Sequence, residues 1–185
     1  STMAAVNRRG KLVALSAMAV GVVVLVAAGF AGKDWIREEW YLWKLRKGSL
    51  EEQTSAAMRL GDMKSTRAVS ALADKVAFTL SNGSELSAAA SRRSKAAALA
   101  LRCIGSAAAV QMLSNILAAP RGSEEEQNAG WVLFLASKEY AFPDWREEGP
   151  PAWKLWVTQL RDDPAQPADV RQLASAVCAK VAVVE

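Results

Sequence analysis

The sequence predicts an all-α protein in which a single N-terminal transmembrane helix precedes a short α-solenoid of paired antiparallel helices. Three observations predict this class. Residues 12–31 carry no charged side chain. From Leu50 onward, apolar residues recur at helical spacing, and the pattern returns after about forty residues. Alanine, leucine and valine dominate a chain that is only 7% aromatic, a composition that favours helices.

The uncharged segment LVALSAMAVGVVVLVAAGFA, residues 12–31, has the length of a bilayer span. A helix rises about 1.5 Å per residue, so this segment covers about 30 Å, the thickness of the hydrocarbon core. A secretory signal is the alternative, because Gly29 and Ala31 resemble a cleavage site, but its apolar region is usually about 7–15 residues long. We therefore expect a basic flank at residues 1–11 and a transmembrane helix at residues 12–32.

Arg8, Arg9 and Lys11 precede the span and are expected to set its topology. Between Lys33 and Lys47 there are five more basic residues, but they belong to a long domain that can cross a membrane regardless of charge. The interpretation is a single-pass protein of the cell membrane, with its N-terminus in the cytoplasm and its helical domain outside.

The net positive charge of the chain comes from its beginning. Four basic residues and no acidic residue occur up to Lys33. The rest of the chain therefore holds 19 of the 23 Lys and Arg and all 19 Asp and Glu, so its net charge is zero. A nucleic-acid binder normally concentrates positive charge on its folded domain. The neutral body therefore excludes nucleic acid as a partner and leaves membrane lipids and other protein subunits.

Residues 33–48, KDWIREEWYLWKLRKG, combine aromatic and basic side chains and are predicted to form an interfacial helix. Ile36, Trp40 and Trp43 recur at i, i+4 and i+7 and so share a helix face. In the alternative reading, the tryptophans pack on the following domain, and both readings hold if the helix uses two sides. The predicted membrane-interface residues are Trp35, Trp40, Tyr41, Trp43, Lys44, Arg46 and Lys47.

Residues 49–80 predict the first helix pair. Ser49 and Glu52 have the spacing of a capping box at the start of a helix. Gly61 is expected to end that helix in the left-handed conformation. The apolar face of the second helix is formed by Ala68, Val69, Leu72, Val76 and Leu80.

The pattern repeats in residues 86–119 after a polar insert. Gly105 corresponds to Gly61, and Val110 to Val69, so the offset is 44 positions for the glycines and 41 for the valines. The stretch EEQTSAAMRLGDMKSTRAVSALADKV resembles a bacterial HEAT repeat of the type found in phycobilisome-lyase-like proteins, in its Ala-Ala pair, its Leu-Gly helix end and its Val-x-x-Leu second helix. The resemblance implies HEAT-like stacking over residues 49–185; a plain helical bundle is the alternative.

The third unit, residues 123–185, departs from this pattern. Ser123 is a predicted N-cap, and the acidic residues that follow it match the helix dipole as a solvated first turn. Three prolines between residues 143 and 151 exclude a continuous helix there. Trp145 and Arg146 lie in this proline-bounded loop and are predicted to contact a partner. Two more amphipathic helices follow, over the regions of Trp153–Leu160 and Val170–Val181.

No residue pattern in the chain points to catalysis, a cofactor or a metal. The sequence contains no histidine, the usual general base near neutral pH and the commonest metal ligand. Cys103 and Cys178 lack CxxC spacing; each is expected to be a small buried hydrophobe, and a disulfide between them stays open.

These observations predict a non-enzymatic, membrane-anchored scaffold, an accessory or assembly subunit of a larger membrane protein complex. The alternative, by analogy with lyase-like relatives, is a pigment- or lipid-binding protein. Its pocket would be lined by Trp131, Phe134, Trp145, Trp153 and Trp156. Large aromatic side chains at helical spacing are more often part of a core.

Overall fold

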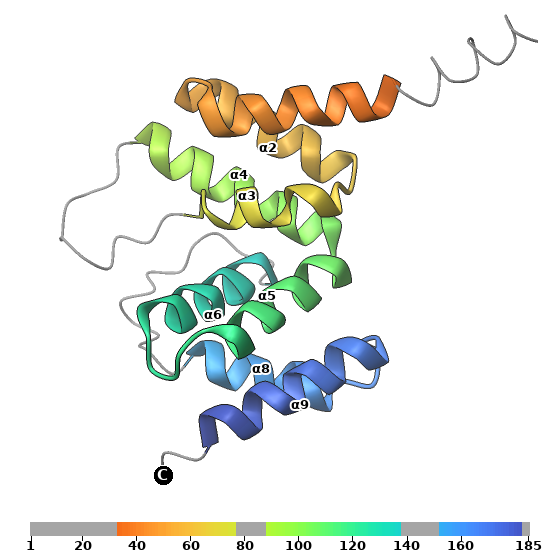
Figure 1. Cartoon of the computed structure of the whole chain (residues 1–185), viewed down its shortest axis with the longest axis vertical. Helices are drawn as coiled ribbons and strands as arrows, with labels where there is room; N and C mark the ends of the chain where they lie inside the picture. The colour runs from red at the N-terminus through yellow and green to blue at the C-terminus, as the bar shows by residue number, and fades with distance from the viewer. Residues whose placement is uncertain (1–32, 77–87, 138–151, 183–185) are drawn as a thin grey trace, which may run out of the picture. The chain divides into compact units, whose positions relative to one another are not determined.

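The computed structural model describes residues 33–76, 88–137 and 152–182, and within these ranges every regular element is helical (Figure 1). This confirms the all-α expectation. The chain divides into two compact units, Ser1–Trp40 and Tyr41–Glu185. The expected flank and span at residues 1–32, and the loop that carries Trp145 and Arg146, lie outside the described residues.

Residues 33–47 are helical and cross the boundary between the two units. The second unit continues with seven α-helices and one short 3-10 helix among its described residues. These are α2 (Leu50–Asp62), η1 (Thr66–Ala68), α3 (Val69–Ala73), α4 (Ala88–Ile104), α5 (Ser106–Ala118), α6 (Glu124–Ser137), α8 (Ala152–Asp162) and α9 (Ala168–Ala182).

None of the described helices is by itself long and apolar enough to cross a membrane. The pair α4 and α5 together has the necessary length and composition, but the two helices are bent by 109° at Gly105. Both helices also contribute to the buried core.

Helix α2 begins as its sequence predicts. The Glu52 backbone N–H donates to Ser49 Oγ at 3.3 Å, and the Ser49 N–H donates to Glu52 Oε2 at 3.0 Å, which completes the capping box. The apolar residues Ala56, Ala57 and Leu60 are buried. The helix start could therefore be read from the sequence because all of its determinants lie within four residues.

The expected role of Gly61 was wrong. The left-handed residue after α2 is Lys64, with φ 51°, and α2 runs through Gly61 to Asp62. A Cβ atom at Gly61 would lie 2.7 Å from Ala100 Cα, so glycine is needed here because the backbones of α2 and α4 approach closely. Gly105 does adopt a positive φ, 76°, at the bend between α4 and α5.

The later helices pack large side chains. Trp131 and Phe134 of α6 meet edge to face, with ring centroids 5.6 Å apart. Trp153 of α8 is fully buried; its indole N–H donates to Gln127 Oε1 at 3.0 Å, and its ring lies where a Cβ at Gly130 would be. Aromatic side chains therefore fill the space between the later helices, whereas the first helices approach closely through alanine and glycine.

Within the second unit, alternate helices contact one another in chain order: α2 packs on α4, α4 on α6, and α6 on α8. Helix α5 packs on both α6 and α9, and α9 pairs with α8 (Figure 1). These contacts place the end of α5, the start of α6 and the end of α9 at one corner.

Candidate functional site

The residues predicted to face a membrane interface lie on the helix at residues 33–47. In the first unit, Trp35, Ile36 and Trp40 are exposed, with relative accessibilities of 58%, 63% and 50%. Large apolar side chains are seldom left this accessible in a group, so the group marks a candidate contact surface.

The part of this helix that belongs to the second unit divides into two sides. Leu42 and Leu45 are buried, and Tyr41 packs partly against the core. Trp43 is 58% exposed. The domain-packing reading of the sequence therefore holds for Tyr41 and its leucine neighbours, and the membrane-interface reading stays a prediction for Trp43.

The predicted basic residues also differ in their surroundings. Lys44 Nζ lies 3.1 Å from Glu52 Oε1, while Arg46 and Lys47 are exposed. The Ser49 backbone N–H, followed by Lys44, holds the pKa of the Glu52 carboxyl below its ordinary value. Lys44 thus fastens this helix to the first turn of α2.

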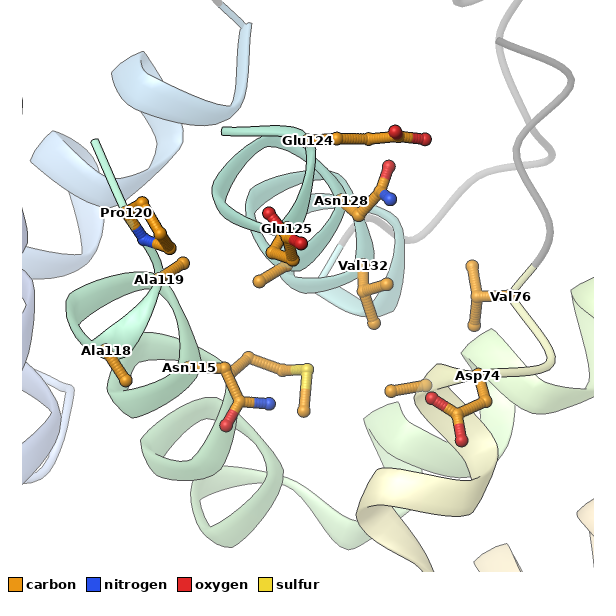
Figure 2. A pocket seen from close by; sticks show the side chains of 13 residues that line it. Asp74, Val76, Asn115, Ala118, Ala119, Pro120, Glu124, Glu125, Asn128 and Val132 are labelled. Atoms are coloured by element: carbon orange, nitrogen blue, oxygen red, sulfur yellow. The ribbon is translucent and has the colours of Figure 1, made fainter. Parts of the chain in front are cut away.

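A groove of about 680 Å³ opens where the end of α3 and the end of α5 face the start of α6 (Figure 2). Its charged and amide side chains are Asp74, Asn115, Glu124, Glu125 and Asn128. Its apolar lining comes from Val76, Met112 and Val132, with four alanines and a proline: Ala73, Ala118, Ala119, Ala129 and Pro120. Among the described residues, the lining holds three carboxyl groups and no basic side chain, so this part of the groove is acidic above an apolar floor.

One carboxylate of this groove, that of Glu125, is stabilised in its charged form at the start of α6. The backbone N–H of Glu125 and the Ser123 hydroxyl lower the pKa of the Glu125 carboxyl. The sequence predicts that Glu124 and Glu125 belong to a solvated first turn, and both are exposed, but no local signal places Asp74 opposite them. The groove was therefore missed, because it is formed by segments that are distant in sequence.

The third residue of the acidic run has another role. Glu126 is 2% exposed, although it was expected to be solvated with its neighbours. Its backbone N–H donates to Ser123 Oγ at 3.2 Å, which confirms the predicted N-cap, and its Oε2 accepts from the Gly122 N–H at 2.9 Å. Glu126 Oε1 lies 2.9 Å from Lys180 Nζ.

Lys180 of α9 connects this carboxylate to the end of α5. Its ammonium also donates to the carbonyl oxygens of Ile116 at 2.5 Å and Ala119 at 2.7 Å. The last carbonyls of a helix lack intrahelical partners and carry partial negative charge, so a cation is stabilising there. We call Glu126, Lys180 and the α5 carbonyls the ion-pair corner; Arg121 reinforces it by donating to the Lys180 carbonyl.

The pKa of Glu126 reflects two opposing effects. Burial of the carboxyl raises the pKa, but the hydrogen bonds from Lys180 and Gly122, with the charge of Lys180, outweigh it and leave the pKa below its ordinary value. Glu126 is therefore ionised near neutral pH. Its charge is used within the fold, which makes the corner a structural element.

The aromatic residues of the alternative pocket hypothesis lie mostly in the core. Trp131, Phe134 and Trp153 are buried, and Trp156 packs partly against them. The groove lining includes none of these four side chains. Trp145 lies outside the described residues.

The cysteines are separate free thiols. Cys103 is exposed, so the expectation of burial was wrong for it; it lies on the solvent side of α4. Cys178 is half-buried, with its Sγ 3.7 Å from Thr158 Oγ1. In the described ranges, no group of three or more His, Cys, Asp and Glu side chains is arranged to hold a metal ion.

No protein-family model, curated protein or solved structure matches the chain, so the resemblance to HEAT repeats stays a prediction from the sequence.

Proposed function

We propose that this protein is a non-catalytic scaffold anchored by a single membrane span, an accessory or assembly subunit of a larger membrane protein complex. The groove between α3, α5 and α6 is the observation that carries the proposal (Figure 2). Its volume, acidic groups and apolar floor suit a protruding segment of another protein. The uncharged segment at residues 12–31 supplies the anchor.

A HEAT-like arrangement fits the contacts within the second unit. Stacked helix pairs bring alternate helices together, and α2, α4, α6 and α8 contact one another in that order. Such an array presents a continuous surface to its partners, which suits a subunit whose role is to hold others in place.

The chemistry of the groove favours a basic partner segment. Three carboxyl groups attract Lys or Arg, while Asn115 and Asn128 offer both donors and acceptors. Apolar side chains beneath them remove water from a partner's aliphatic side chain. The partner is therefore expected to present a short segment that combines basic and aliphatic residues.

Purification of the full chain in a mild detergent tests the scaffold. We expect stoichiometric partner subunits with the wild-type protein and their loss from the variant Asp74→Asn/Glu124→Gln. Asp62→Asn is the matched control, because Asp62 is an exposed carboxylate on α2 outside the groove. Recovery of the wild-type protein as a lone monomer would contradict the proposal, as would equal partner recovery from all three proteins.

We further propose that the helical domain lies outside the cytoplasm. The exposed thiol of Cys103 provides a direct probe. A membrane-impermeant maleimide should label intact cells that express the wild-type chain, and Cys103→Ser should remove most of that label. Labelling of Cys103 only after the cells are lysed would place the domain in the cytoplasm instead.

A further inference from the structure

The helix at residues 33–47 has two apolar faces on opposite sides. With about 100° of rotation per residue, Ile36, Trp40 and Trp43 fall within a sector of about 60°. The residues Leu42 and Leu45, with Tyr41, centre on the opposite side of the same helix. We call Ile36, Trp40 and Trp43 the tryptophan face. A helix that only packed on a domain would need one apolar face.

The burial of each side follows this division. In the second unit, Leu42 and Leu45 are 3% and 0% exposed, whereas Trp43 is 58% exposed. In the first unit, Ile36 and Trp40 are exposed as well. The second unit therefore buries the side that carries Leu42 and Leu45, while the indole of Trp43 stays exposed on that unit.

The basic and acidic residues of this helix also lie on different sides of it. Lys33, Arg37 and Lys47 lie within about a quarter turn of the centre of the tryptophan face. Lys44 lies in the same range but is paired with Glu52, and Glu39 is the one acidic residue of the helix there. The other acidic residues of this helix, Asp34 and Glu38, lie on the opposite half. The accessible apolar face thus has a basic rim.

We infer that the tryptophan face lies in the headgroup region of an anionic lipid bilayer, as a second lipid attachment that rests on the membrane anchoring in the proposed function. Indole rings favour this region because they are apolar yet carry an N–H donor. Lysine and arginine extend from the rim to lipid phosphates. Gly32 alone separates the uncharged segment at residues 12–31 from Lys33, so a span there would place the start of this helix at the bilayer surface.

Basic charge around the face and continuity with the span favour lipid over a protein partner as the occupant. A protein interface would need an acidic partner at the depth of the headgroups, where anionic phosphates already supply the complementary charge. The second unit gains a fixed contact with the bilayer from this arrangement, because Trp43 projects from the same helical turns whose leucines are held in the core.

Lipid quenching of tryptophan fluorescence tests the inference. The full chain is reconstituted into vesicles of phosphatidylcholine with a minor fraction of phosphatidylglycerol, brominated on the acyl chains near the headgroup. We expect bromine-dependent quenching in the wild-type protein. Part of it comes from Trp35 beside the predicted span and should persist, and the remainder should be lost in Trp40→Phe/Trp43→Phe. These changes keep an aromatic ring at exposed positions, so the fold should persist, as far-UV circular dichroism can check.

The matched control is Trp156→Phe, which removes a half-buried indole on α8 and should leave the bromine-dependent loss of intensity unchanged. Omitting phosphatidylglycerol or raising the salt concentration should weaken the quenching of the wild-type protein, because the basic rim acts through screened charge. Undiminished quenching in the double variant, or none in the wild-type protein, would overturn the inference; the former is the expected result if a protein covers this face.

Alkaline extraction of the same vesicles separates this inference from the proposed function. A chain anchored by residues 12–31 stays with the lipid whether or not the tryptophan face is bound. Release of the wild-type chain would contradict the span itself, whereas retention with undiminished quenching in the double variant would contradict only the attachment of the tryptophan face.

Discussion

The junction of α2 with α4 and the ion-pair corner of α5, α6 and α9 solve the same packing problem in different ways. At the first junction, Gly61 lies against Ala100, and the two backbones approach until a single Cβ would not fit. At the corner, Lys180 neutralises Glu126 and caps the last carbonyls of α5. One contact depends on the absence of a side chain and the other on two long charged ones.

The two contacts are sensitive to single substitutions for different reasons. Small-residue contacts fail by steric overlap when an atom is added. A buried ion pair fails when one partner is removed, because the other charge is left without compensation. The variants below test this contrast, and the one expected to be most destabilising comes first.

Lys180→Met should destabilise the fold most. It leaves the Glu126 carboxylate buried without its cation, and breaking a buried pair in this way costs about 3–5 kcal/mol. Urea unfolding of the detergent-solubilised chain measures the change. The double variant Glu126→Gln/Lys180→Met should lose less than the sum of the two single changes; simple additivity would show that the pair is not coupled.

Gly61→Ala should destabilise the protein by about 1–3 kcal/mol, the usual cost of overpacking. At an open helical site the same change would stabilise by about 0.5–1 kcal/mol, so the sign of the effect is diagnostic. The midpoint of thermal unfolding measures the sign of the change. A raised midpoint would mean that α2 and α4 are further apart than the Gly61–Ala100 approach requires.

Ser49→Ala should cost about 1 kcal/mol, because it removes the side-chain acceptor of the capping box. The matched control Ser55→Ala, at an exposed position inside α2, should be neutral or slightly stabilising, since alanine is the better helix former. Urea unfolding of both variants isolates the cap. Equal effects of the two changes would contradict its contribution.

The ion-pair corner also predicts a dependence on pH. The pKa of Glu126 is lower in the folded protein than its ordinary value of 4.5, so its contribution is complete above that pH and is lost as the pH falls through the folded pKa. Glu126→Gln should therefore flatten the loss of stability in acid. Parallel acid profiles of the wild-type protein and the variant would assign that loss to other carboxyl groups.

Local determinants could be read from the sequence, and distant ones could not. The caps at Ser49 and Ser123 and the bend at Gly105 depend on a few neighbouring residues, and each is present. Gly61 was assigned the wrong role because a close approach of two helices and a helix end select the same residue. The groove and the partner of Glu126 require knowledge of which helices meet, and no short-range pattern carries that information.

The ion-pair corner also constrains the order in which the chain can become stable during its synthesis. Lys180 follows Ile116 by 64 positions, so the end of α5 and the start of α6 leave the ribosome well before their cation does. Until α9 emerges, Glu126 must stay hydrated, and that corner cannot close around it. The junction of α2 and α4 needs no residue from the end of the chain. A nascent chain can therefore pack these two helices before the corner of α5 and α6 is complete.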